Sequence, residues 1–234
     1  MSSVPTAIGQ IPKYRGAKSR SALKAAVANT GCLRVDVEGE SAFLELANEI
    51  GTIAPSPRAG ELIEVLSVEE RSAKRNSMTS RFGTGSFPLH TDQAFVRVPP
   101  RYVLLYSCTP QFSRGTELVR LSSLRWSSQD DQSFVRGVWS VDTGVTTFLT
   151  PLMTTSRNSH ERIFRYDPCI MRPLCSLARR AAHALKVALE SASITTHTYT
   201  EGECLILDNW NSLHGRAPGS GDEGQRKLLR ISVN

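Results

Sequence analysis

The hydrophobic and polar positions of the chain repeat with two periods, which predict many short strands and a few helices. Alternating or continuous apolar runs of strand length lie at residues 32–37, 61–66, 102–107, 117–121, 137–148, 163–166, 195–200, 204–207 and 226–233. Helical spacing lies at residues 19–28, at 41–50 and most clearly at 176–191. The pattern favours a mainly β fold, a closed or sandwiched antiparallel sheet with flanking helices.

The chain divides into a short arm and one domain. Residues 1–20 are polar and basic and are interrupted by Pro5, Gly9 and Pro12, which is typical of a loosely ordered N-terminal arm. The 234 residues are 40% hydrophobic, enough for one substantial core but not for two. We therefore predict a single domain over residues 21–234. Irregular segments are expected at residues 52–60, 69–86 and 150–161.

Composition disfavours several classes of protein. No run of about 18 apolar residues occurs, and the first residues lack the apolar core of a secretion signal, so we expect a cytoplasmic protein without a membrane span. The five cysteines are odd in number, scattered, and without the close pairs of structural zinc sites. They are expected to be reduced thiols, mostly buried.

The basic charge of the chain has two interpretations. A net charge of +6 suggests nucleic-acid binding, but the basic residues are dispersed and aromatic residues make up only 7% of the chain. A nucleic-acid partner is therefore disfavoured. An active site built for a small anionic molecule accounts for the excess equally well.

Two residues near the middle of the chain form a candidate metal site. His90 and Asp92 are two apart, so on an extended strand their side chains leave by the same face and can bind one ion. His214 is the best candidate for a third ligand, because it follows an apolar strand and a turn signal at Asp208 and Asn209. Two imidazoles and one carboxylate leave several coordination positions open, as in non-haem Fe(II) oxygenases that bind a co-substrate and dioxygen.

Two arginines near the C-terminus complement this metal site. Arg226 and Arg230 are four apart on the predicted last strand, so their guanidinium groups share one face. Guanidinium groups bind carboxylates through two parallel hydrogen bonds. The pair suits a dicarboxylate co-substrate and an acidic substrate.

Five motifs occur in an order that resembles a known family. They are GTGSFPLHTD at residues 83–92, PPRYVLL at 99–105, RGT at 114–116, DNWNSLHGR at 208–216 and RKLLR at 226–230. Together they resemble the taurine dioxygenase-like (TauD/TfdA) family of Fe(II)/2-oxoglutarate-dependent oxygenases, in its clavaminate synthase-like branch. The resemblance covers residues 20–234 and implies a double-stranded β-helix, the cupin-like jelly roll, with metal ligands at the barrel mouth.

The resemblance implies roles for individual residues. His90, Asp92 and His214 would hold Fe(II), while Thr116 and Arg226 would bind the distal carboxylate of 2-oxoglutarate. Arg230 lies where relatives often bind the acidic group of the substrate. With dioxygen, this set implies hydroxylation of an unactivated carbon with release of succinate and carbon dioxide.

The substrate is expected to be a small amino-acid-like or carboxylate-bearing molecule. Candidates for substrate contacts are Phe87, Gln93, Arg165 and Asp167, although Arg165 and Asp167 could instead pair with each other. Three alternatives remain at this point: the same chemistry on a carrier-tethered, peptide or nucleic-acid substrate, a jelly-roll metal enzyme of another kind, and a binding protein that has lost catalysis.

Overall fold

Two antiparallel sheets form the centre of the molecule. The computed structural model describes residues 11–13, 20–57, 60–67, 81–83, 85–109, 114–157, 159–219 and 227–234. The larger sheet contains, in spatial order, β1 (Cys32–Asp36), β13 (Glu203–Asp208), β5 (Tyr102–Ser107), β15 (Lys227–Val233) and β2 (Ile53–Ala54), and β3 (Glu64–Ser67) also pairs with β15. The smaller sheet contains β12 (Thr195–His197), β6 (Thr116–Arg120), β14 (Ser212–Arg216) and β4 (Phe87–His90).

The continuous apolar run of β5 lies between two separate cores. Val103 and Leu105 point toward the smaller sheet and pack with Leu118 of β6. The alternating residues Tyr102 and Leu104 point the other way, toward helices α1 (Arg20–Thr30) and α2 (Gly39–Ile50). Both faces of the strand are therefore buried, which explains why its sequence does not alternate between apolar and polar residues.

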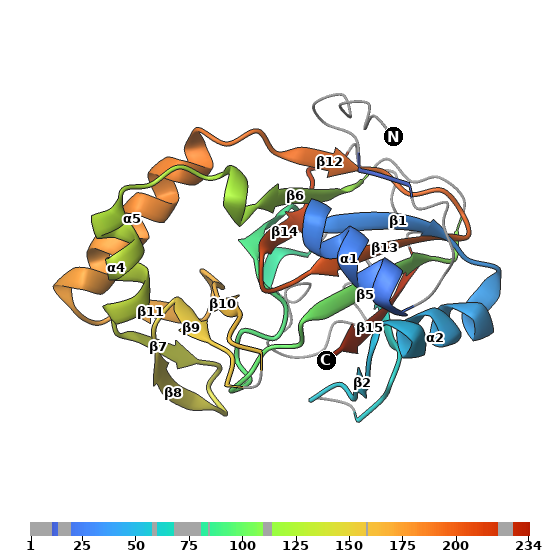
Figure 1. Cartoon of the computed structure of the whole chain (residues 1–234), viewed down its shortest axis with the longest axis horizontal. Helices are drawn as coiled ribbons and strands as arrows, with labels where there is room; N and C mark the ends of the chain where they lie inside the picture. Colours follow the sequence, from blue (N-terminus) through green and yellow to red (C-terminus); the bar gives the residue numbers. More distant parts are fainter. Residues whose placement is uncertain are drawn as a thin grey trace.

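A second group of elements packs at the side of the sheets (Figure 1). It contains the 3-10 turn η2 (Leu121–Ser123), helices α4 (Ser128–Arg136) and α5 (Ser176–Glu190), the sheet β11 (Met171–Pro173), β7 (Trp139–Asp142) and β8 (Thr147–Thr150), and the hairpin β9 (Met153–Thr155) and β10 (Arg162–Phe164). The inner faces of α4 and α5 share one apolar cluster with β7 and β11. The whole is a mainly β, jelly-roll core with flanking helices, as the sequence predicted.

Three predicted segments differ from the structure. Residues 150–161 were expected to be irregular, but they contain β9, whose three residues pair with β10. Residues 52–60 contain β2, whose Ile53 pairs with Val233 at the end of the chain. The strand expected at residues 61–66 begins only at Glu64. β2 and β3 are short strands that pair with β15 at the far end of the chain, which local periodicity does not report. β9 is a three-residue strand in a local hairpin with β10, too short to show a clear alternation.

Part of the expected N-terminal arm contacts the domain. Lys13 forms a parallel bridge with Arg34 of β1, and the Pro12 carbonyl accepts a hydrogen bond of 2.9 Å from the Arg34 amide. Ile11 is buried. Residues 1–10 and 14–19 lie outside the described residues, so the loose order expected of residues 1–20 stays a prediction for those positions.

Two expectations from composition can be compared with the described residues. None of the helices described here has the length and hydrophobicity needed to cross a membrane. None of the five cysteines forms a disulfide, as expected, but only Cys32 and Cys204 are buried and the other three are partly exposed, so the expectation that most are buried was wrong.

Candidate active site

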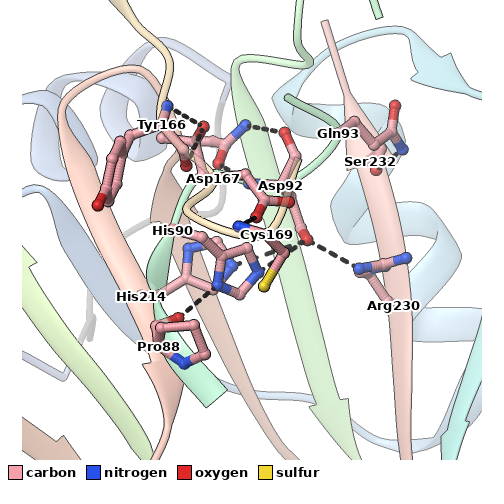
Figure 2. Close-up of polar contacts among 12 residues, drawn as sticks. Pro88, His90, Asp92, Gln93, Tyr166, Asp167, Cys169, His214, Arg230 and Ser232 are labelled. Carbon is pink, nitrogen blue, oxygen red and sulfur yellow. Dashed lines mark hydrogen bonds and ion pairs between the residues drawn. The ribbon is translucent and has the colours of Figure 1, made fainter. Parts of the chain in front are cut away.

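Three potential metal ligands meet on one face of the smaller sheet. His90 of β4 lies opposite His214 of β14, so both side chains leave the sheet on the same side. The Nε2 atoms of His90 and His214 lie 3.7 and 3.8 Å from the two carboxylate oxygens of Asp92. One ligand atom from each residue lies within 4.8 Å of the other two, and all three residues are buried. Figure 2 shows the cluster between β4, β14 and the loop that carries Asp92.

Asp92 reaches this cluster from a turn and not from the strand that the sequence predicted. β4 ends at His90, and residues 92–95 form a turn. The Asn209 side chain holds this turn in place: its oxygen accepts a hydrogen bond of 2.8 Å from the Asp92 amide, and its nitrogen donates to the Asp92 carbonyl at 3.1 Å. Thr91 is held in turn by the backbone of Tyr166, with hydrogen bonds in both directions.

Hydrogen bonding determines which nitrogen of His90 faces the cluster. The Nδ1 of His90 lies 2.9 Å from the Pro88 carbonyl, which can only accept, so Nδ1 carries the proton. In the neutral ring, Nε2 is then unprotonated and its lone pair faces the cluster, which is the tautomer that a metal ligand requires. The Nδ1 of His214 is buried and has no hydrogen-bond partner among the described residues, so the ring makes its polar contact with Asp92 through Nε2.

The charges around the cluster favour the metal-binding protonation states of two of the three residues. Burial opposes ionisation of Asp92, but Arg230 and the two histidines outweigh it and hold the pKa of Asp92 well below its ordinary value. Burial lowers the pKa of His214, which keeps that imidazole neutral. Burial also disfavours the charged form of His90, but Asp92 outweighs it and raises the pKa of His90. A metal ion therefore competes with a proton mainly at His90.

Arg230 joins the cluster to a second carboxylate. Its Nη1 donates to both oxygens of Asp92, at 2.9 and 3.0 Å, and its Nε donates to Glu64 at 2.8 Å. Arg230 and Glu64 lie opposite each other in the paired strands β15 and β3. Burial disfavours the charged guanidinium, but Asp92 and Glu64 outweigh this and raise the pKa of Arg230. A cation and an anion thus lie side by side next to the candidate metal site.

The hydroxyl of Thr116 lies on the same face of the sheet as the histidines. Leu118 is opposite His214, so Thr116, two residues earlier in β6, points to the same side. The RGT motif requires a glycine at position 115, because a Cβ there would collide with the His197 carbonyl oxygen of β12. Arg226, the other residue expected at the distal carboxylate, lies outside the described residues. Co-substrate binding by both residues stays a prediction.

The four remaining candidates for substrate contacts have different surroundings. Phe87 is partly exposed at the start of β4, with the Arg216 guanidinium 3.6 Å above its ring. Gln93 has a positive φ of 54° and donates to Ser232 Oγ at 2.9 Å. Asp167 lies near His90 and accepts a hydrogen bond of 2.8 Å from the Cys169 amide (Figure 2).

Arg165 does not form the ion pair with Asp167 that the sequence suggested. The residue is 3% exposed, and its guanidinium donates to the carbonyls of Ala94, Val96 and Arg97. Burial lowers the pKa of Arg165 to about 10. The residue holds the loop that follows Asp92, so a direct contact between Arg165 and substrate stays an untested prediction.

Two of the sequence motifs are joined by buried hydrogen bonds. Asn209 donates to the carbonyl of Pro100 at 2.9 Å, and the indole of Trp210 donates to the carbonyl of Pro99 at the same distance. The two prolines of PPRYVLL thus present carbonyls to the first residues of DNWNSLHGR. Sequence reasoning treated Asn209 only as a turn signal and did not identify Glu64, because the partners of both residues are distant in sequence.

The donor set fits a divalent metal ion. Two imidazoles and one carboxylate, mutually within reach and buried, are the ligands that non-haem Fe(II) sites use. Among the described residues, these three form the one group of three or more such side chains close enough to share an ion.

Comparisons with known proteins agree with this geometry. The model of the family described as "Taurine catabolism dioxygenase TauD, TfdA family" matches residues 8–232. No curated protein sequence matches the chain significantly. Among solved structures, PvcB from Pseudomonas aeruginosa is 14% identical, with a TM-score of 0.68 over 92% of this chain and 80% of that one. OrfP, in complex with Fe and alpha-ketoglutaric acid, is 21% identical, with a TM-score of 0.67 over 87% and 75%.

A third solved structure is similar to the same extent. It is an asparagine oxygenase in complex with Fe(II), 2S,3S-3-hydroxyasparagine and succinate, which is 17% identical, with a TM-score of 0.69 over 91% of this chain and 79% of that one. At these identities the structural likeness establishes the jelly-roll fold, whereas the family model matches nearly the whole sequence. The chain belongs to the TauD/TfdA family.

Proposed function

We propose that this protein is an Fe(II)/2-oxoglutarate-dependent dioxygenase that hydroxylates a small amino-acid-like substrate. The observation that carries the proposal is the buried cluster of His90, Asp92 and His214, with Arg230 bonded to its carboxylate. Solved relatives support it, since OrfP was determined with Fe and alpha-ketoglutaric acid, which is 2-oxoglutarate.

The residues of the site have two separate tasks in this proposal. His90, Asp92 and His214 would hold Fe(II) and leave coordination positions open for the co-substrate and dioxygen. Iron, 2-oxoglutarate and dioxygen together supply the oxidation that replaces a C–H bond with C–OH and releases succinate and carbon dioxide. Thr116 and Arg226 are assigned to the distal carboxylate of 2-oxoglutarate. The chain itself supplies binding, orientation and exclusion of water.

The side chains beside the iron site favour an amino-acid-like substrate. Arg230 and Glu64 place a guanidinium next to a carboxylate, a pair complementary to the carboxylate and ammonium groups of an amino acid. Solved relatives were determined with such molecules: OrfP with (3S)-hydroxy-L-Arg, and asparagine oxygenase with hydroxyasparagine. A substrate carboxylate would compete with Glu64 and Asp92 for the donors of Arg230.

The first experiment tests the cofactor chemistry. Anaerobic protein is loaded with Fe(II) and titrated with 2-oxoglutarate, and the weak metal-to-ligand charge-transfer absorption is recorded before oxygen is admitted and succinate is assayed. We expect a band and succinate release with the wild type, neither with Asp92→Ala, and both with Asp142→Ala, an exposed aspartate of β7. Tight zinc binding without any band in the wild type would contradict the proposal and favour a metal enzyme of another kind.

A second experiment tests the substrate class. L-amino acids are screened by substrate-dependent succinate release, and each active compound is compared with its N-acetyl and methyl ester derivatives. We expect both modifications to abolish stimulation, because each removes one charge from the pair that Arg230 and Glu64 complement. Equal stimulation by the derivatives, or activity only on carrier-tethered or peptide substrates, would contradict the amino-acid assignment and leave the cofactor chemistry intact.

A further inference from the structure

A buried tyrosine outside the predicted site contacts the residue expected to bind the co-substrate. The hydroxyl of Tyr199 lies 2.8 Å from Oγ1 of Thr116, and the two side chains are 0% and 3% exposed. Tyr199 follows β12, the edge strand that pairs with β6 and places His197 opposite Thr116. A hydrogen bond between two hydroxyls at this depth fixes the direction of both.

The position of Thr116 relative to the histidines gives this contact a functional context. Thr116 lies two residues along β6 from Leu118, the partner of His214, which corresponds to roughly 7 Å along the strand. 2-Oxoglutarate has two methylene groups between its keto group and its distal carboxylate, so its two ends need separate binding groups. Thr116 is therefore displaced along the strand from His214 and the candidate iron site, as a group that binds the distal carboxylate of 2-oxoglutarate must be.

The chemistry of the two hydroxyls decides which one donates. A phenol is a stronger hydrogen-bond donor than an aliphatic alcohol, so Tyr199 donates and the Thr116 oxygen accepts. The proton of Thr116 is then directed away from Tyr199 and is available to another acceptor. Its donor strength also increases, because a hydroxyl that accepts one hydrogen bond donates the next more strongly.

The ring of Tyr199 is held rigidly enough to serve this purpose. It packs edge-on against the His197 ring, with centroids 4.7 Å apart, and belongs to the apolar cluster between the two sheets. We propose that Tyr199 is a positioning residue for the co-substrate, whose hydroxyl directs the Thr116 hydroxyl toward the distal carboxylate of 2-oxoglutarate. The inference rests on the proposed function, because it requires 2-oxoglutarate at this site.

The test compares two ligands that differ only at the distal end. Fe(II)-loaded, anaerobic wild type and Tyr199→Phe are titrated with 2-oxoglutarate and with 2-oxopentanoate, which has a methyl group in place of the distal carboxylate. We expect Tyr199→Phe to weaken 2-oxoglutarate binding about 10-fold and to change 2-oxopentanoate binding less than about twofold. The KM for 2-oxoglutarate should rise similarly, with kcat at saturation and Fe(II) affinity unchanged.

Matched variants separate this role from a general loss of packing. Tyr106→Phe removes another tyrosine hydroxyl, which bonds the backbone of Gly39 on the far side of the larger sheet, and should bind both ligands as the wild type does. Thr116→Val should show the same carboxylate-specific loss as Tyr199→Phe, and the double variant should lose no more than Thr116→Val alone.

Three results would overturn the inference. Equal losses for the two ligands in Tyr199→Phe would indicate a structural role only, and unchanged affinity for both would remove Tyr199 from the site. If Tyr199→Phe does not fold, an unchanged 2-oxoglutarate affinity in Thr116→Val would overturn the inference by itself. A wild type that forms no complex with Fe(II) and 2-oxoglutarate would instead refute the proposed function, so the two failures are distinguishable.

Discussion

The carboxamide of Asn209 binds both backbone polar groups of Asp92. Its oxygen accepts from the Asp92 amide at 2.8 Å, and its nitrogen donates to the Asp92 carbonyl at 3.1 Å. Asn209 is fully buried and lies five residues before His214. One side chain therefore sets the distance between the turn that carries the carboxylate and the strand that carries the second histidine.

Replacement of Asn209 should weaken metal binding more than its effect on folding explains. We expect Asn209→Ala to lower Fe(II) affinity by about 10- to 100-fold, the usual cost of losing a residue that orients a ligand. The measurement is the gain in unfolding free energy when Fe(II) is added. This gain should be about 1.4–2.7 kcal/mol smaller in Asn209→Ala than in the wild type.

Asn211→Ala is the control for this prediction, because Asn211 is exposed two residues later and its side chain donates to the Asp208 side chain, away from Asp92. It should keep the wild-type response to the metal. If Asn209→Ala unfolds more easily but gains as much stability from Fe(II) as the wild type, Asn209 acts in folding alone.

The helices and strands whose own sequence has a clear hydrophobic pattern were predictable. Helix α5 has a clear apolar stripe, and the unbroken apolar run of β5 indicated burial on both faces. His90, Asp92 and His214 were proposed together from the order and spacing of their motifs, and the structure places them close enough to share an ion, although Asp92 was expected on a strand. The prediction of a strand at Asp92 was wrong because the position of Asp92 depends on Asn209, more than a hundred residues away.

Contacts made by one polar side chain with a distant backbone or hydroxyl could not be predicted. Arg165 and Asp167 are neighbours in sequence, so an ion pair was a natural expectation, but three carbonyls of the loop after Asp92 use the guanidinium instead. Glu64 lies in a short strand whose partner is the last strand of the chain. Periodicity carries no information about such pairings.

The two arginines of the last motif should affect different ligands. Arg226→Ala should raise the KM for 2-oxoglutarate by about 10- to 100-fold, the range expected for losing a hydrogen-bonded charge. Arg230→Ala should raise the KM for the amino-acid substrate by a similar factor and leave the KM for 2-oxoglutarate within about twofold. Steady-state kinetics with each ligand varied in turn provides the comparison, and the opposite pattern would exchange the two assignments.

Cys175 should be the most reactive thiol of the chain. Its sulfur accepts hydrogen bonds from the amides of Val138 and Ala178, at 3.3 and 3.4 Å, at the N-terminus of α5. These backbone N–H groups lower the pKa of Cys175, whereas burial raises the pKa of Cys32 to about 11 and also raises the pKa of Cys108 and Cys169.

Timed alkylation with iodoacetamide near neutral pH, followed by peptide mass spectrometry, should therefore label Cys175 first and Cys32 last among these four. Cys175→Ser should remove the fast phase and keep the stability of the protein, because serine is a good residue at this helix position. Faster labelling of Cys108 or Cys169 would show that access and not the pKa controls reactivity.

Glu203 should make the stability of the fold depend on acid pH. Its carboxylate is buried and lies 3.2 Å from the Arg34 guanidinium and 3.5 Å from Nε2 of His197. Burial opposes its ionisation, but His197, the Thr200 amide and Arg34 outweigh burial and lower the pKa of Glu203 from 4.5 to about 2. Because the folded-state pKa is lowered, the stabilisation is complete above the unfolded-state pKa and is lost as the pH falls toward about 2.

The shift corresponds to about 3 kcal/mol of unfolding free energy at neutral pH. Urea unfolding of the wild type and Glu203→Gln between pH 2 and pH 7 measures it. The wild type should be more stable by an amount that is constant above about pH 4.5 and shrinks below it. Glu201→Gln, at an exposed glutamate in the turn before β13, should follow the wild-type curve throughout. A wild-type advantage over Glu203→Gln that does not change with pH would mean that Glu203 contributes through its shape and neutral hydrogen bonds, and not through its charge.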